Sequence, residues 1–324
     1  MDERKYTMTH SILCVGELLI DFFCKERNVD LQQGQTFIKH AGGAPANVCA
    51  TIAKLGSNAY FLGKVGDDPF GEFLRNTLNT MNVHTNFLFQ DKKSPTTLAF
   101  VSLQENGQRD FIFNRGADAQ LTMDEISINS LKPFKMIHFG SATALLPGPL
   151  QETYFDLFAF AKTNHCFISF DPNFRSDLWK GQEQSFIDLA LSCIAKSDFI
   201  KLSDEELFII TGEENMQKAV TFLHLLGARY IAVTLGERGT YFSSSTKSLI
   251  VPSIPITAVD TTGAGDAFVG AILYKLSQIK SFHQLSFEDW VEFITFGNKV
   301  GAIVCEKIGA IEALPTLEEV EARS

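Results

Sequence analysis

The stretch Asp260–Ala271 combines glycines, a carboxylate and the start of an apolar helical pattern. Gly263 and Gly265 flank Ala264, and Asp266 follows directly. Bare backbone N–H groups at the start of a helix attract anions, so a carboxylate there is expected to accept a proton or to hold a cation. Phosphoryl transfer to a hydroxyl needs donors for the phosphate charge and a base for the hydroxyl proton. These residues are equally typical of a helix that carries an acid in its first turn.

A second glycine turn lies near the other end of the chain. Gly42 and Gly43 precede Pro45 and Asn47, and a small-residue apolar pattern then runs to Gly56. This order predicts a turn, a proline in the first helical turn, a helix and a glycine stop. The two glycines let a ligand approach the backbone closely, and Asn47 offers a donor and an acceptor to a hydroxyl. Asn47 could equally satisfy local backbone groups, as asparagine often does near helix starts.

Two acids lie in apolar surroundings close to the first predicted strand. Glu17 and Asp21 follow the apolar run Ile12–Val15. A buried acid is costly unless it has a partner or a function, so we expect a polar role for Asp21 in particular.

From Lys135 onward, strand-like and helical segments alternate. The expected strands cover residues 135–140, 166–171, 198–202 and 230–235. The expected helices cover residues 149–163, 182–196, 204–211, 216–226, 264–276 and 290–305. This alternation predicts right-handed βαβ units and a mainly parallel sheet covered on both faces. Ligands bind at the carboxyl ends of such strands, and several of the residues above follow strand-like runs.

A small sheet is expected outside the main one. Residues 96–104 and 109–115 have strand-like composition, and the Asn106-Gly107 pair between them is a hairpin signal. We pair this hairpin with the extended, polar segment 29–40. The prediction is one domain over residues 1–324, with lid segments near 18–40 and 96–116. A second subunit could cover the exposed lid edge, so a homodimer through the lid is expected.

Composition excludes several classes of protein. The 324 residues are 45% hydrophobic and 20% charged, which is typical of a globular protein with a substantial core. The net charge of −10 disfavours nucleic acid or an anionic membrane as a partner. The six cysteines form no CxxC pair, so we expect buried thiols. The polar start and the absence of long apolar runs predict a cytoplasmic protein.

The two glycine motifs resemble the N-terminal and C-terminal signatures of the ribokinase family of sugar kinases. The resemblance runs from about Leu13 to Pro315 and is strongest to the fructokinase branch. It implies a ribokinase-like three-layer α/β/α sandwich with a mainly parallel central sheet and a small β-sheet lid. It also implies ATP and Mg²⁺ as cofactors, with K⁺ as a further ion, and transfer of a phosphoryl group from ATP to the 6-hydroxyl of D-fructose.

The same resemblance assigns roles in catalysis and sugar binding. Asp266 would be the base, and Gly263, Ala264 and Gly265 would supply the N–H groups of an anion hole. The residues expected to contact the sugar are Asp21, Gly42, Gly43, Asn47, Arg115 and Arg175.

Nucleotide binding must come from outside a P-loop, because the chain has no GxxxxGK[ST] sequence. Lys201–Glu206 resembles the family's Asn-x-x-Glu element, with Ser203 in the asparagine position and Glu206 supporting Mg²⁺ through water. Without the resemblance, these acids read as first-turn helix residues capped by Ser203. The further residues that the resemblance assigns to ATP are Lys201, Thr234, Gly236, Gly239 and Asn298. Asp260 and Gly309 lie where the family often has a K⁺ site.

Three alternatives remain open on the sequence. The first alternative is a sugar kinase with another substrate. The favoured substrate among these is 2-keto-3-deoxygluconate, followed by ribose or a nucleoside. Phe113 lacks the hydroxyl of the tyrosines typical of ketodeoxygluconate kinases, which favours a neutral ketose. A catalytically inactive sugar-binding regulator would not need Asp266. A nicotinamide-dependent oxidoreductase is disfavoured, because no GxGxxG turn follows the first strand.

Overall fold

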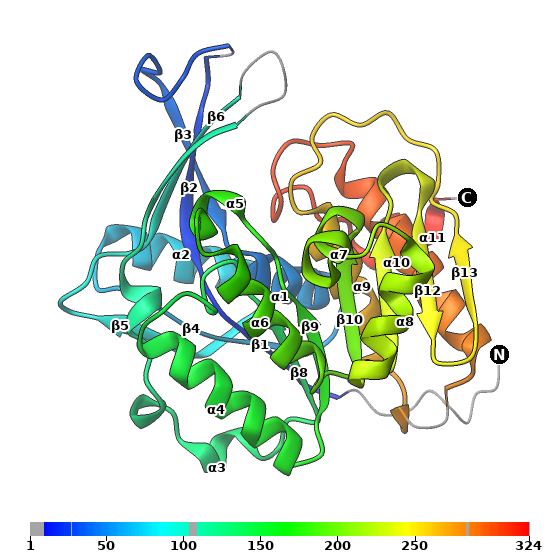
Figure 1. Ribbon diagram of the computed structural model, residues 1–324. Helices are drawn as coiled ribbons and strands as arrows, with labels where there is room; N and C mark the ends of the chain where they lie inside the picture. The colour runs from blue at the N-terminus through cyan, green and yellow to red at the C-terminus, as the bar shows by residue number, and fades with distance from the viewer. Residues whose placement is uncertain (1–9, 27, 104–108, 283–284, 324) are drawn as a thin grey trace.

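The computed structural model of the chain (Figure 1) describes residues 10–26, 28–103, 109–282 and 285–323. Its main sheet has nine strands in the order β13-β12-β11-β10-β9-β8-β1-β4-β5. All neighbouring pairs are parallel except β11–β12 and β12–β13. The strands are β1 (Ile12–Val15), β4 (Ala59–Gly66), β5 (His84–Asp91), β8 (Met136–Gly140), β9 (Phe167–Asp171), β10 (Phe199–Ser203), β11 (Tyr230–Thr234), β12 (Thr240–Ser244) and β13 (Ser248–Val251).

Helices cover both faces of this sheet and give three layers. Strand β1 illustrates the arrangement, because Ile12 and Cys14 belong to one core cluster whereas Leu13 and Val15 belong to the other. The first cluster is completed by α1 (Ala44–Lys54), α2 (Pro69–Thr80), α9 (Ala264–Ser277), α10 (Phe287–Val304) and α11 (Leu317–Ala322). The second is completed by α3 (Ile128–Leu131), α4 (Pro149–Thr163), α5 (Ser176–Trp179), α6 (Glu183–Ile194), α7 (Asp204–Thr211) and α8 (Met216–Leu226). The predicted α/β/α architecture is confirmed.

A separate four-stranded sheet projects from one end of the body (Figure 1). Its order is β3-β2-β6-β7, with strands β2 (Leu19–Cys24), β3 (Phe37–Gly42), β6 (Leu98–Leu103) and β7 (Arg109–Asn114). The hairpin and the segment that ends in β3 lie in the same small sheet, as predicted, but they do not pair directly. Strand β2 runs between them and pairs with both β3 and β6. The Asn106-Gly107 turn lies outside the described residues.

Close packing of three helices fixes the start of α9. A Cβ at Gly270 would lie 2.5 Å from Cβ of Thr51 and 2.9 Å from the carbonyl oxygen of Val48, so glycine lets α9 approach α1. A Cβ at Gly301 of α10 would lie 3.0 Å from the carbonyl oxygen of Ala264. Helix α9 is therefore packed closely against α1 at Gly270 and against α10 at its first turn.

Asn298 ties α10 to the antiparallel edge of the main sheet. Its Oδ1 accepts a hydrogen bond from Thr240 (2.6 Å), and its Nδ2 donates to the carbonyl oxygens of Val251 (2.9 Å) and Pro252 (3.2 Å). Within the part of the chain that the structure describes, no helix combines the length and the apolar character needed to cross a membrane.

Asn298→Ala should lower the free energy of unfolding by about 1–3 kcal/mol, because it leaves buried polar groups without partners. Denaturant unfolding measures the loss. The matched control is Asn76→Ala on the exposed face of α2, where we expect a change within about 0.5 kcal/mol. Equal effects of the two substitutions would contradict this account of Asn298.

Candidate active site

A pocket of about 310 Å³ opens at the carboxyl ends of the central strands. The turn after β9 contributes Asn173 and Arg175, and the junction of β10 with α7 contributes Lys201 and Glu206. The start of α9 contributes the third wall, including Gly263, Gly265 and Asp266. The structure thus brings together Arg175, the Lys201–Glu206 element and the C-terminal glycine motif, which lie far apart in the sequence.

The first turn of α9 presents N–H donors to this pocket. Gly263 caps the helix at φ 75°, a left-handed conformation that favours glycine. The N–H of Ala264 already donates to the carbonyl oxygen of Thr261 (3.3 Å). Among the described residues, no acceptor receives the N–H groups of Gly265 or Asp266. The N–H of Gly263 likewise has no acceptor among the described residues, so Gly263, Gly265 and Asp266 offer donors to an anion, whereas the expected donor Ala264 is occupied.

The Asp266 carboxylate lies where α9 meets α1. Asn47 donates from Nδ2 to Oδ2 of Asp266 at 2.8 Å. Burial raises the pKa of Asp266 to about 6, and the negative charge of Asp171 acts in the same direction. The Asn47 hydrogen bond and the Lys201 and Arg175 cations oppose the rise. The result is a carboxyl group that titrates close to neutral pH, which suits a general base.

Asp21 on β2 is a second buried acid on which the Arg175 cation acts. Burial raises the pKa of Asp21 to about 7, and the Arg175 cation opposes this rise. A Cβ at Gly42 would lie 1.9 Å from Oδ2 of Asp21, so the first glycine of the turn makes room for the carboxylate. The second, Gly43, has φ 112° and caps α1. Glycine is therefore required at position 42 by the space that Asp21 occupies and at position 43 by the backbone conformation.

An ion pair lies beneath the pocket and was not anticipated from the sequence. Lys201 Nζ donates to Oδ2 of Asp171 at 3.1 Å, and Oδ1 of Asp171 accepts from the N–H of Asn173 at 3.1 Å. The sequence signal for Asp171 was its place at the end of a strand, which by itself does not reveal a partner 30 residues away.

Glu206 lies in the pocket wall with both oxygens engaged. Its Oε2 accepts from the N–H of Ser203 (2.8 Å), which completes the capping box that the sequence allowed. Its Oε1 accepts from the N–H of Phe174 (2.8 Å). A carboxylate held in this way still has lone pairs for a water molecule, which fits the expected support of Mg²⁺ through water.

The expected K⁺ pair is adjacent in the structure. Oδ2 of Asp260 accepts from the N–H of Gly309 at 3.0 Å, and Oδ1 accepts from both the N–H and the hydroxyl of Thr262. The carboxylate fits a hard cation, whereas Gly309 fits one only through its carbonyl oxygen.

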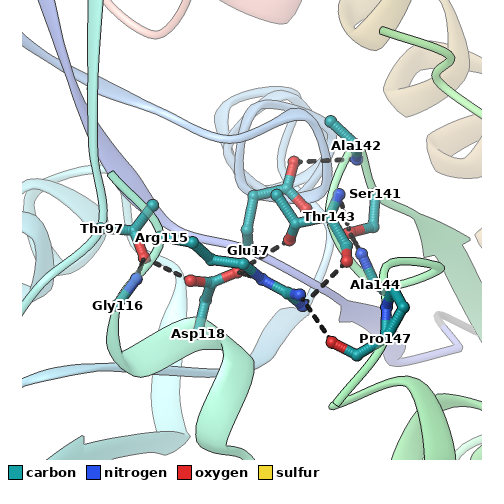
Figure 2. Close-up of polar contacts among 10 residues, drawn as sticks. All are labelled: Glu17, Thr97, Arg115, Gly116, Asp118, Ser141, Ala142, Thr143, Ala144 and Pro147. Carbon is teal, nitrogen blue, oxygen red and sulfur yellow. Dashed lines mark hydrogen bonds and ion pairs between the residues drawn. The ribbon is translucent and has the colours of Figure 1, made fainter. Parts of the chain in front are cut away.

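Arg115 is engaged in a polar network (Figure 2) and is not among the residues that line the pocket. Its guanidinium donates to the carbonyl oxygens of Thr143 (2.9 Å) and Pro147 (3.1 Å) and pairs with Asp118. Asp118 also accepts from the hydroxyls of Thr97 and Thr143. These contacts anchor the smaller sheet to the loop after β8, and a sugar-binding role for Arg115 stays a prediction.

Glu17, also drawn in Figure 2, has a comparable structural task. Its carboxylate accepts from the N–H groups of Ala44 (3.2 Å) and Ala142 (3.3 Å) and from the Ser141 hydroxyl. Burial raises its pKa to about 7, and the Ser141 hydrogen bond opposes the rise. Glu17 thereby holds the start of α1, the helix that carries Asn47.

The other residues assigned to ATP lie beyond the pocket lining. Thr234 is the register partner of Ser203, which places it at the neighbouring strand end. Gly236 and Gly239 shape the turn after β11, with φ 60° and 91°. Asn298 uses its amide in the contacts with β12 and β13 described above. Their nucleotide contacts stay predictions.

The comparison with known families decides the class of this site. Residues 9–317 match the family described as pfkB family carbohydrate kinase. The chain belongs to this family of carbohydrate kinases. It is therefore a sugar kinase that transfers a phosphoryl group to a hydroxyl, as the resemblance implied.

Individual pfkB relatives agree over nearly the whole length. The chain is 39% identical over 311 residues to Fructokinase-2 of Oryza sativa subsp. japonica, covering 94% of this chain and 91% of the relative. A fructokinase from Xylella fastidiosa with bound ATP superposes with a TM-score of 0.88 at 30% identity, covering 96% and 97%. A double-mutant fructokinase from Vibrio cholerae O395 in its fructose, ADP and potassium form gives 0.86 at 30% identity, covering 97% and 98%.

Asn47→Ala should raise the pKa of Asp266 above its value of about 6, because it removes a hydrogen bond that stabilises the ionised form. Carbon-13 NMR of labelled aspartate carboxyls, assigned with Asp266→Asn, measures the titration. Asn76→Ala on α2 is the control and should leave the titration unchanged. A titration of Asp266 that stays in place or moves to lower pH in Asn47→Ala would contradict the assigned contact.

Proposed function

We propose that this pfkB kinase is an ATP-dependent fructokinase, with the 6-hydroxyl of D-fructose as the acceptor and fructose 6-phosphate and ADP as products. The observation that carries the proposal is the Asp266 carboxylate. It is held by Asn47 from α1 and lies beside unpaired N–H donors at the start of α9. A base and an anion site are thus adjacent, which is what phosphoryl transfer to a hydroxyl requires. The names of the relatives, fructokinases from plants and bacteria, support the choice of sugar.

The reaction is a single displacement at phosphorus. Asp266 accepts the proton of the 6-hydroxyl as the sugar oxygen forms its bond to the γ-phosphorus of ATP. The bond from that phosphorus to the β-phosphate oxygen breaks, and ADP leaves with the electron pair. The N–H groups of Gly263, Gly265 and Asp266 donate to the phosphoryl oxygens while charge builds up there.

The nucleotide is proposed to enter the pocket between the turn after β9 and the start of α9. Its phosphates would lie over Gly263–Gly265, with the adenosine toward the strand ends that carry Ser203 and Thr234. Mg²⁺, when bound, would supply positive charge to the β- and γ-phosphates. Glu206 would hold it through water. Asp260 would hold K⁺, as a potassium-bound relative suggests.

The sugar is proposed to bind between the main body and the smaller sheet. Asp21, Gly42, Gly43 and Asn47 surround the turn where β3 passes into α1. A carboxylate and an amide are natural partners of neighbouring hydroxyls, and each charge-assisted contact contributes about 1.5–3 kcal/mol. Arg175 lines the pocket and acts electrostatically on both Asp21 and Asp266, so its cation is near the proposed sugar-binding acid and the proposed base. The smaller sheet would serve as the lid.

A sugar panel tests the proposal. With saturating Mg·ATP at one pH, release of ADP is measured for D-fructose, 2-keto-3-deoxygluconate, D-ribose and adenosine, with a sugar-free blank. We expect the highest kcat/KM for fructose, and phosphorus NMR of the product should show the phosphate on carbon 6. A higher kcat/KM for the acid sugar, or a phosphate on another carbon, would overturn the assignment.

A further inference from the structure

Position 265 has little room for a side chain, although the backbone conformation there does not require glycine. Unlike Gly263, it lies in the first turn of α9 without a left-handed conformation. A Cβ at Gly265 would lie 3.0 Å from Nζ and 3.4 Å from Cε of Lys201. The missing side chain at position 265 therefore makes room for the Lys201 ammonium, which lies directly against the N-terminal turn.

Lys201 reaches this position from inside the protein. It lies on β10 and is 9% exposed, and it lines the same pocket as Gly265 and Asp266. Its ammonium donates to Asp171. Among the described residues, the remaining two N–H donors of Nζ have no protein acceptor. They are available to a ligand in the pocket.

Asp171 holds the ammonium in place. It is 2% exposed, and its two oxygens are occupied by Lys201 and by the N–H of Asn173. Burial lowers the pKa of Lys201, but the carboxylates of Asp171, Glu206 and Asp266 outweigh this and raise the pKa above its ordinary value. Lys201 is therefore charged at neutral pH.

Stability alone does not explain why the charged Lys201 ammonium is buried beside the pocket. Replacing a buried ion pair by apolar residues is often neutral or stabilising, so the pair is weak evidence of a purely structural role. The ammonium is the cation that lies against Gly265, next to the N–H groups that face the pocket. At this position the ammonium can contact an anion that binds transiently at the first turn of α9.

We propose that the Lys201 ammonium contacts the phosphoryl group during its transfer and is thus a catalytic residue, and that Asp171 positions this ammonium; the inference rests on the proposed kinase chemistry of the site. As the sugar oxygen bonds to the γ-phosphorus and the bond to ADP breaks, charge spreads over the phosphoryl oxygens. Lys201 keeps its proton throughout and donates it in a hydrogen bond, while Asp266 takes the sugar proton. Gly265 is glycine because Lys201 must lie beside it.

The first test removes the charge but keeps the length of the side chain. Lys201→Met should lower kcat by about 10²-fold or more, as loss of one transition-state donor does. The KM for the sugar should change much less. The matched control is Lys64→Met on β4, which removes a lysine that is 6% exposed and pairs with Asp91 and Glu125. Lys64→Met should lower the melting temperature and leave kcat near wild type.

If Lys201→Met does not fold, because it leaves Asp171 buried and unpaired, the double variant Lys201→Met/Asp171→Asn removes both charges. It should fold and show the same loss of kcat. A folded variant without the Lys201 charge that retains half of the wild-type kcat would overturn the proposal.

A pH profile separates positioning from general damage. The groups that act on the Asp266 carboxyl are Asn47 on α1, Asp171 at the end of β9, Lys201 on β10 and Arg175 in the next turn. Lys201→Met removes a positive charge, so the acid limb of kcat/KM should move to higher pH. Asp171→Asn removes a negative charge, so the limb should move to lower pH. Two shifts in the same direction would contradict the arrangement.

A double-mutant cycle tests the link to Gly265. Gly265→Ala should lower kcat in the wild-type background, because the new methyl group displaces the ammonium. In the Lys201→Met background the same change should alter kcat by less than about twofold, since the displaced group is gone. Additive losses would mean that Gly265 serves ligand approach alone, and would overturn its proposed link to Lys201.

The outcomes are distinguishable from failure of the fructokinase assignment. Every variant is compared on whichever sugar the wild-type chain phosphorylates fastest. A different preferred sugar would overturn fructose as the substrate and would leave the proposed role of Lys201 in phosphoryl transfer unaffected. The complex of ADP, aluminium fluoride and sugar, which mimics the transferring phosphoryl, gives a readout by binding. Lys201→Met should weaken this complex far more than it weakens ADP alone, and equal weakening would overturn the proposal.

Discussion

The position of the Asp266 carboxylate depends on the close packing of α9 against α1. Gly270 removes the side chain that would separate the two helices, and Asn47 then reaches Asp266 across 219 residues of sequence. Glu17 holds the start of α1 by accepting its Ala44 N–H group, so the partner of Asp266 is itself fixed from the β1 side. In the proposed reaction, the hydroxyl of the sugar and the phosphate of the nucleotide meet at this junction. Under that proposal, small changes in helix spacing would affect chemistry before they affected the fold.

The site is built from charges that are expensive to bury. Asp21 and Asp266 have pKa values raised to about 7 and about 6, chiefly by burial, and the Arg175 cation opposes both rises. The Lys201–Asp171 pair adds a cation below the helix start. The pKa of each acid is thus close to neutral pH, where it can gain or lose a proton. An exposed carboxylate would stay ionised at that pH. Under the proposed function, sugar, phosphate and metal ion would supply the remaining partners when they bind.

Much of the fold could be predicted from the sequence because hydrophobic periodicity is local. Helices α4, α7 and α8 begin and end where the pattern placed them. Strands β5, β12 and β13 were missed. The edge strands β5 and β13 are partly exposed, and each has an apolar run of three residues, 87–89 and 249–251, which is a weak strand signal.

Side-chain partners were harder to predict, because they depend on residues far apart in the chain. Arg115 and Asn298 were assigned to ligands by motif, yet the structure engages them with Thr143, Pro147 and Thr240. Nothing in the local sequence around these residues indicates those contacts. The glycine motifs were more informative, since Gly42, Gly43 and Gly263 each have a conformational or packing need that the sequence already suggested.

The most direct measurement compares sugar binding with turnover in Asp266→Asn, a substitution that keeps the shape and the neighbour Asn47 but removes the base. Calorimetry gives the affinity for fructose, and release of ADP gives kcat. The account predicts sugar affinity close to wild type with kcat reduced by about 10²–10⁴-fold. Turnover near the wild-type rate would contradict the assignment of Asp266 as the group that accepts the sugar proton.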